Sequence, residues 1–97
     1  SRAAFLTRLE AGKVSREALA DLFEQARLLL AGALLLPYGS PPCAGTEEVV
    51  QLLASRLTKP QILCTIDLLQ TYRSHCSYNV GVGPTLGGFA VELEEIL

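Results

Sequence analysis

The stretch SREALADLFEQARLLLAGALLL, residues 15–36, decides the fold of this 97-residue chain. Its apolar side chains recur every three or four positions, which is the spacing of one face of an α-helix. They are Leu19, Leu22, Phe23, Ala26, Leu29, Leu30, Ala33 and Leu34. Ser15 is a favourable N-cap, and Pro37 cannot continue a helix. From Leu28 to Leu36 the pattern is apolar nearly all round, which predicts a central helix buried on several sides.

Glycine and proline divide the rest of the chain into shorter segments. A short opening helix from Ala4 to Leu9 is expected to stop at Gly12. A loop from Tyr38 to Gly45 follows the central helix, because its Gly and Pro residues suit neither helix nor strand. No stretch shows sustained alternation of apolar and polar residues, so we expect no β-strand.

Two capping signals predict the next two helices. Thr46 stands before two glutamates, as an N-cap with carboxylates in the first turn does, and opens a short helix. The apolar face of this helix is Val49, Val50, Leu53 and Leu57. Thr58 and Gln61 have the spacing of a capping box and open a fourth helix, which should end near residues 79–81. Its apolar face is Ile62, Ile66, Leu69, Tyr72 and Cys76.

A last helix is predicted with Gly83 as its cap and Pro84 at its first position. The apolar face of this helix is Leu86, Phe89, Ala90, Leu93, Ile96 and Leu97. Gly87 and Gly88 fall inside it, where each costs about 1 kcal/mol relative to Ala. Close packing, within the domain or against a partner, would be a reason to keep them. The sequence therefore predicts an all-α fold, a single compact bundle of four to five helices.

Charge and hydropathy exclude several classes of function. The net charge is −2, and no run of basic residues occurs, so this segment alone is not expected to bind DNA or RNA directly. The longest apolar run, from Leu28 to Leu36, is shorter than the about 20 residues that span a bilayer, so no membrane partner is expected. The three cysteines cannot all pair within one molecule, which favours reduced thiols and a cytoplasmic location.

No motif predicts catalysis, a cofactor or a metal site. The segment from Gly81 to Gly88 lacks the Lys and the Ser or Thr that end a phosphate-binding P-loop. His75 and Cys76 are adjacent and diverge by roughly 100° on a helix, so we interpret them as a partly exposed imidazole and a buried thiol. Cys64 and Cys76 would lie about 18 Å apart along one helix, too far to share a metal ion. The segment is therefore not expected to be an enzyme.

Four segments carry a resemblance to one family of helical domains. They are Ala33-Leu34-Leu35-Leu36, Leu53-Ala54-Ser55-Arg56-Leu57-Thr58, Ile66-Asp67-Leu68-Leu69 and Tyr78-Asn79-Val80. Together with the Gly/Pro loop, they resemble the C-terminal collar domain of a bacterial DNA polymerase III clamp-loader subunit, most closely delta-prime. In such domains a long helix ends in an Asn-rich turn. Asn79 matches the first Asn of that turn, and Gly81 replaces the second.

The resemblance implies a subunit-assembly domain. Collar domains of this family pack side by side in a pentameric ring that supports ATP-dependent loading of the sliding clamp. The implied partners are the other clamp-loader subunits, and the sliding clamp and DNA are reached only through the rest of the complex. Residues 1–97, which contain no methionine, would be a C-terminal domain excised from a longer chain. The candidate subunit contacts are Tyr78, Asn79, Gly87 and Gly88.

Three alternatives stand beside this interpretation. The gamma/tau collar shares the fold and the ring, and an intact Walker lysine upstream would identify it. A freestanding helical adaptor or regulator, binding a peptide or a partner helix in a groove, would have a start methionine just before Ser1. An enzyme would need a deep pocket in which His75 and a carboxylate converge.

Overall fold

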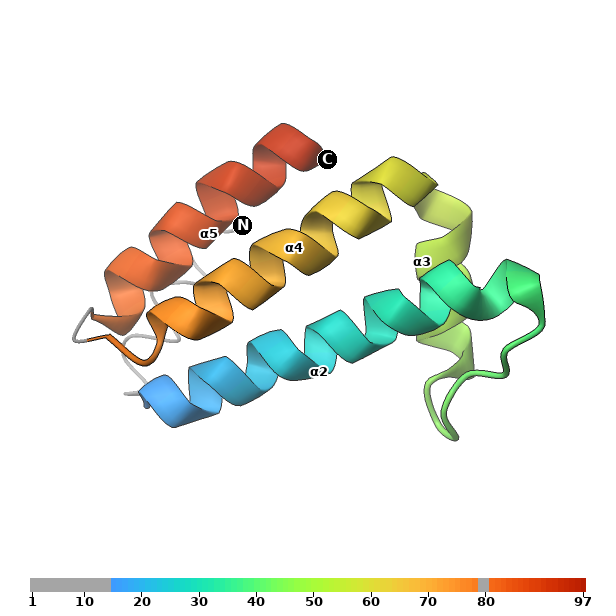
Figure 1. The fold of residues 1–97 in the computed structure, drawn as a ribbon, viewed down its shortest axis with the longest axis horizontal. Helices are drawn as coiled ribbons and strands as arrows, with labels where there is room; N and C mark the ends of the chain where they lie inside the picture. Colours follow the sequence, from blue (N-terminus) through green and yellow to red (C-terminus); the bar gives the residue numbers. More distant parts are fainter. Residues whose placement is uncertain (1–14, 79–80) are drawn as a thin grey trace.

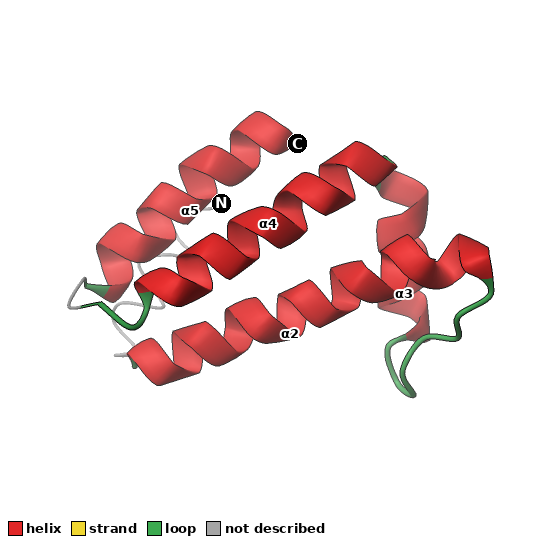
Figure 2. Ribbon diagram, in the orientation of Figure 1, coloured by secondary structure: helices red, strands yellow, loops and turns green. Residues whose placement is uncertain are grey.

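The computed structural model describes residues 15–78 and 81–97. Within these ranges the elements are α2 (Arg16–Leu35), the 3₁₀ helix η1 (Leu36–Tyr38), α3 (Glu47–Arg56), α4 (Lys59–His75) and α5 (Val82–Ile96). The described residues contain no β-strand, so the predicted all-α bundle is confirmed (Figure 2). The opening helix predicted from Ala4 to Leu9 lies outside the described residues, as does its stop at Gly12.

The long helices lie side by side, with α4 between α2 and α5 (Figure 1). Each runs in the opposite direction to its neighbour, because only six residues separate α4 from α5 and the short helix α3 lies between α2 and α4 in the chain. Helix α3 crosses the C-terminal end of α2 and packs on it. The bundle measures 40 × 27 × 25 Å.

The core lies mainly between α2 and α4, and α3 and α5 each contribute to it. Its buried apolar members are Leu19, Phe23, Leu30, Ala33, Val50, Ile62, Leu68, Leu69, Tyr72, Cys76 and Leu86. Three aromatic rings meet where α2, α4 and α5 come together. The ring centroid of Phe23 lies 5.0 Å from that of Phe89 and 6.4 Å from that of Tyr72.

Both ends of α2 follow the sequence prediction. The hydroxyl of Ser15 accepts a hydrogen bond of 3.1 Å from the backbone N–H of Ala18. At the other end Pro37 has no N–H to donate, and the chain leaves the α-helix at Leu35 for the 3₁₀ helix η1. The predicted cap and the predicted stop are therefore confirmed.

The predicted burial of α2 on several sides is wrong. Leu28 is 50% exposed and Leu35 is 48% exposed, although Leu30 and Ala33 between them are buried. Leu22, placed in the apolar face by its spacing, is 52% exposed. The physical reason is that a helix apolar all round needs neighbours on every side, and the described elements leave Leu22, Leu28 and Leu35 of α2 uncovered.

The start of α4 is as predicted. The N–H of Gln61 donates to the hydroxyl of Thr58 at 3.2 Å, and the N–H of Thr58 donates to the side-chain oxygen of Gln61 at 2.9 Å. This reciprocal pair is the predicted capping box. The helix ends at His75, before the predicted boundary at 79–81, because the next three residues bond to carbonyls three positions back. Such bonds belong to a 3₁₀ turn.

Two other predicted caps are wrong in detail. Thr46 is the N-cap of α3, but its hydroxyl donates to the carbonyl of Cys43 at 2.6 Å instead of accepting from a helix N–H. Helix α5 begins at Val82, with Gly81 as its cap, two residues before the predicted start. Pro84 therefore lies inside the first turn, where an N–H has no partner in the helix in any case.

Candidate functional site

Exposed apolar side chains gather on the C-terminal half of α2. Leu28 and Leu35 are seven positions apart and lie on the same side of the helix. Beside them is a shallow groove of about 290 Å³ between α2, the loop after η1 and α3. Its lining is Gln25, Leu28, Leu29, Ala31, Gly32, Leu35, Ser40, Pro41, Pro42, Cys43, Thr46 and Val50. No charged side chain lines it, and we call it the α2–α3 groove.

Local sequence features give the groove its shape. Gly32 faces Val50 of α3, since a Cβ at Gly32 would lie 3.4 Å from a methyl group of Val50, which is ordinary van der Waals contact. The loop turns at Gly39 and Gly45, whose φ angles of 85° and 86° favour glycine. The loop also closes on Thr46, whose N–H and hydroxyl both donate to one carbonyl, that of Cys43.

Two acidic residues each lie one helical turn from a residue that lines this groove. Asp21 lies one turn before Gln25 on α2, and Glu47 lies one turn before Val50 on α3. Both are exposed, and neither forms an ion pair within the described part of the chain.

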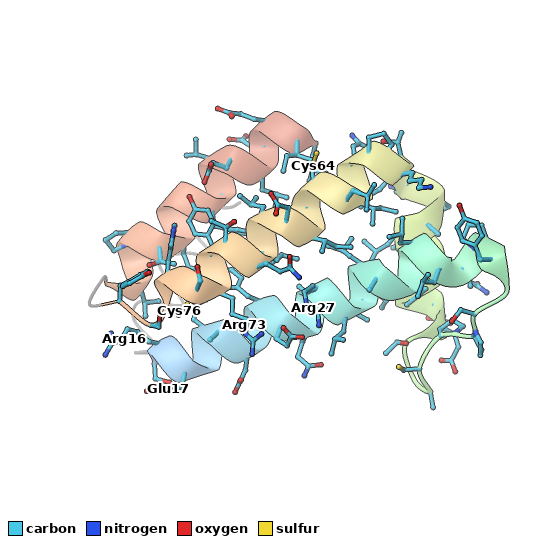
Figure 3. The ribbon with its side chains drawn as sticks, in the orientation of Figure 1. Arg16, Glu17, Arg27, Cys64, Arg73 and Cys76 are labelled. Carbon is cyan, nitrogen blue, oxygen red and sulfur yellow. The ribbon has the colours of Figure 1, made fainter. Side chains whose placement is uncertain are left out.

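Arg27, the basic residue of this part of α2, is already engaged. The Nε of Arg27 donates to both carboxylate oxygens of Glu24 at 3.1 Å, and Arg73 of α4 approaches the same carboxylate at 2.8 Å. Figure 3 shows Arg27 and Arg73 near the junction of α2 and α4. The hydrogen bond from Arg27 lowers the pKa of Glu24, and the charges of Arg27 and Arg73 lower it further.

The subunit contacts predicted from sequence lie elsewhere. Tyr78, in the turn after α4, is 63% exposed, and its carbonyl accepts a hydrogen bond of 2.7 Å from Arg16. Asn79 lies outside the described residues. A Cβ at Gly87 would meet no atom within 4 Å, whereas one at Gly88 would lie 3.0 Å from the hydroxyl oxygen of Tyr72. The close neighbour of Gly88 is therefore a side chain of its own bundle.

The interpretation of His75 and Cys76 is confirmed. The His75 ring packs edge-on against the Tyr72 ring, with centroids 4.9 Å apart. Cys76 is buried, and its thiol donates to the carbonyl of Tyr72 at 3.4 Å. Burial raises the pKa of this thiol, and the positive charge of Arg16 opposes the effect. A buried neutral thiol is a poor nucleophile.

The other two cysteines are exposed and lie apart. Cys43 lines the α2–α3 groove, and Cys64 of α4 lies in a separate depression that Glu92 and Glu95 of α5 also line. Figure 3 shows Cys64 on α4. Among the described residues, no three His, Cys, Asp or Glu side chains are placed to hold a metal ion together. None of the described helices combines the length and the apolar character needed to cross a membrane.

Sequence reasoning missed the groove although its signal was present. Residues 28–36 are apolar nearly all round, and we interpreted this as burial within the bundle. The same pattern also fits an exposed contact surface, which is where Leu28 and Leu35 lie. The loop residue Cys43 carried no signal, because only the folded loop places it beside α2.

Comparison of the chain with protein-family models, curated proteins and solved structures finds no match in any of the three.

Proposed function

We propose that this chain is a subunit-assembly domain, which packs apolar helix surface against other protein subunits. The observation that carries the proposal is the α2–α3 groove, with Leu28 and Leu35 half-exposed at its edge and no charged side chain in its lining. A continuous apolar surface with a polar rim is typical of a protein contact site. A solvent-facing helix would instead carry polar residues at these positions.

We further propose that the assembly is the collar of a bacterial DNA polymerase III clamp loader. The sequence resemblance at residues 33–36, 53–58, 66–69 and 78–80 supports this, and so does the all-α architecture. The shared pattern favours the delta-prime subunit, with gamma/tau as the close relative. In this function the domain holds the ring together while other modules hydrolyse ATP.

A ring position requires two different contact surfaces, because head-to-tail packing presents unlike patches to the two neighbours. The α2–α3 groove lies beside the C-terminal half of α2. The C-terminal end of α4 and the N-terminal end of α5 lie at the opposite end of the bundle from α3 (Figure 1). At that end Tyr78 is exposed, and Gly87 has open space above it. These two ends could serve two neighbours at once.

The test is assembly with purified clamp-loader subunits from the same organism, measured by size-exclusion chromatography with light scattering. The expected result is a complex of defined stoichiometry that contains one or more copies of the chain. The replacement Leu28→Asp should weaken that complex by at least about tenfold in Kd, since it puts a charge into an apolar contact. Failure of the wild-type chain to join any complex would overturn the clamp-loader assignment.

The groove also favours a second candidate, a freestanding adaptor that binds one amphipathic helix. An adaptor would bind its target one to one and would need no second surface. The replacement Tyr78→Ala separates the two functions. It should weaken ring assembly and leave binding of a single helix unchanged, because Tyr78 lies in the turn at the other end of α4 from the groove.

A further inference from the structure

We propose that residues 1–14 of this chain bind α5 of the same chain, in a hollow whose described lining is Ala90, Leu93, Glu94 and Leu97. The inference goes beyond the proposed function, because it concerns a contact within one chain and holds whichever partners the chain has. The apolar surface of the hollow, the reach of the segment and the charges on the two sides each support it.

The hollow is an apolar surface that the other described helices leave open. Its volume is about 410 Å³, and every described residue that lines it belongs to α5. Its three apolar members are spaced by three and four positions, so they lie on one side of the helix. A different side of α5 packs on α4, because Gly88 and Glu92, one turn apart, both lie at Tyr72. Helix α4 therefore does not cover the hollow.

Residues 1–14 carry apolar side chains that match this surface. The sequence of the segment, SRAAFLTRLEAGKV, predicts a short helix from Ala4 to Leu9. In such a helix Phe5 and Leu6 lie one turn before Leu9, so the three side chains share one side. An amphipathic helix of this kind is stabilised when its apolar side packs against another apolar surface. The hollow on α5 provides one.

The segment joins α2 at the end of the bundle where α5 begins. The guanidinium of Arg16 donates to the carbonyl of Tyr78 at 2.7 Å, which holds the start of α2 beside the turn after α4. Figure 1 shows that α2 and α5 begin at the same end of the bundle. A segment that enters α2 from this end and lies along α5 must run antiparallel to α5, as α4 does.

The segment is long enough to reach the hollow. At 1.5 Å per residue, Ala90 lies about 12 Å and Leu97 about 22 Å along the helix axis from Val82, the first residue of α5. Fourteen residues span about 21 Å as a helix and about 46 Å when fully extended. The segment can therefore lie over the hollow in either form or in a mixture of the two.

Charge complements the apolar contact. Helix α5 carries three glutamates and no basic residue, and one of these glutamates, Glu94, lines the hollow. The segment carries Arg2, Arg8 and Lys13 against one acidic residue, Glu10. Opposite charges on the two sides favour this pairing. The described lining of the α2–α3 groove, in contrast, contains no charged side chain that could attract these basic residues.

Cysteine reactivity in the full chain tests the contact. Cys43 and Cys64 are first replaced by Ser because both are exposed, and Cys76 is kept because it is buried. In this background Ala90→Cys reports on the hollow. Val91→Cys is the matched reporter, because Val91 is the next residue of α5, is 59% exposed and does not line the hollow. Mass spectrometry measures the alkylation rate of each reporter.

The apolar contact is removed by Phe5→Asp combined with Leu9→Asp, since a charge in an apolar contact is unfavourable. This double variant should speed alkylation of Ala90→Cys by at least about tenfold and that of Val91→Cys by less than about twofold. Circular dichroism checks that the variant is folded. An unchanged rate at Ala90→Cys would overturn the inference, and so would an equal acceleration at both reporters.

The charge contribution is tested by Glu94→Lys and Glu95→Lys, which make the same change of charge at adjacent positions. Glu94 lines the hollow, whereas Glu95 lines the separate depression between α4 and α5. Glu94→Lys should speed alkylation of Ala90→Cys by about threefold more than Glu95→Lys does. High salt should narrow that difference, because it screens exposed charges. Equal effects of the two variants would overturn the pairing of the segment with this side of α5.

Chain concentration distinguishes this contact from the same contact between two copies. A segment that binds α5 of its own chain protects Ala90→Cys equally at every chain concentration. Protection that grows with chain concentration would identify the segment of a second copy as the occupant and would overturn the inference.

Discussion

Tyr72 of α4 donates its phenolic hydrogen to the carboxylate of Glu92 in α5, and its hydroxyl oxygen lies beside Gly88. Phe89, the next residue of α5, packs against the Tyr72 ring with centroids 5.7 Å apart. A hydrogen bond, an aromatic contact and the absence of a side chain at one position thus coincide where α5 meets α4. This contact attaches the last helix to the bundle.

The Tyr72 hydroxyl makes the free energy of unfolding change with pH in the alkaline range. The hydrogen bond to Glu92, with burial and the negative charge of Glu92 in support, raises the pKa of Tyr72 from 10.0 to about 12. Because the folded state favours the protonated phenol, this contribution is complete below pH 10.0 and is lost as the pH rises toward 12. Tyr72→Phe should therefore lose less stability than the wild type over this interval. Urea unfolding followed by circular dichroism gives the free energy of unfolding of both proteins at several pH values in this interval. If the two free energies fall in parallel as the pH rises, the assignment is wrong.

Alanine at the two adjacent glycines of α5 should have opposite effects. Gly87→Ala should raise the free energy of unfolding by about 0.5–1 kcal/mol, because a methyl group there meets nothing and favours the helix. The free energy of unfolding of Gly88→Ala should be at least about 1 kcal/mol lower than that of Gly87→Ala, since the new methyl group crowds the Tyr72 hydroxyl at 3.0 Å. In a Tyr72→Phe background that gap should shrink. A double-mutant cycle measured by urea unfolding tests this, and purely additive effects would show that the contact carries no energy.

The Thr58 cap at the start of α4 should contribute more to stability than the Thr46 cap of α3. Thr58→Ala should lower the free energy of unfolding by about 1 kcal/mol, because it leaves the N–H of Gln61 without its acceptor. Thr46→Ala is the matched control and should cost less, because the Thr46 hydroxyl accepts no helix N–H. Thermal and urea unfolding of the two variants give the comparison. Equal losses would mean that the cap of Thr58 contributes nothing specific.

Acid should weaken the link between α2 and α4 that passes through Glu24. Its pKa is lowered from 4.5, first by the hydrogen bond from Arg27, so its contribution is complete above pH 4.5 and is lost as the pH falls through the folded-state pKa. Glu24→Gln should be less stable than the wild type at neutral pH, and the two should converge in acid. Asp21→Asn is the control, because Asp21 forms no ion pair in the described residues. A difference that persists in acid would point to packing instead of charge.

Local signals predicted some helix boundaries and missed others. The Thr58 capping box and the Ser15 cap were correct, because each depends on side chains only three positions from their acceptors or donors. The start of α5 was misplaced, since Gly81 and Gly83 are equally able to precede a helix and the sequence offers no side-chain cap to distinguish them. The end of α4 was misplaced for a similar reason, because no Gly or Pro follows His75 directly.

The candidate site was harder to predict than the fold. Helical periodicity identified Phe23, Leu30 and Leu69 as core residues, but it gave the same status to Leu22, which is exposed. Periodicity assigns a residue to one side of a helix and does not say whether another helix covers that side. Gly88 was singled out for close packing, yet its neighbour, the Tyr72 hydroxyl, could not be named from sequence.

The sequence by itself determined that this chain is all-α, and it placed the long helix and its two ends, because capping, proline and helical period act over a few neighbouring residues. Only the tertiary structure decided that Leu28 and Leu35 face outward and that Cys43 and Val50 come beside them. Burial depends on which elements pack against a face, and that choice is made by the whole bundle at once. The exposed groove on α2 is the result.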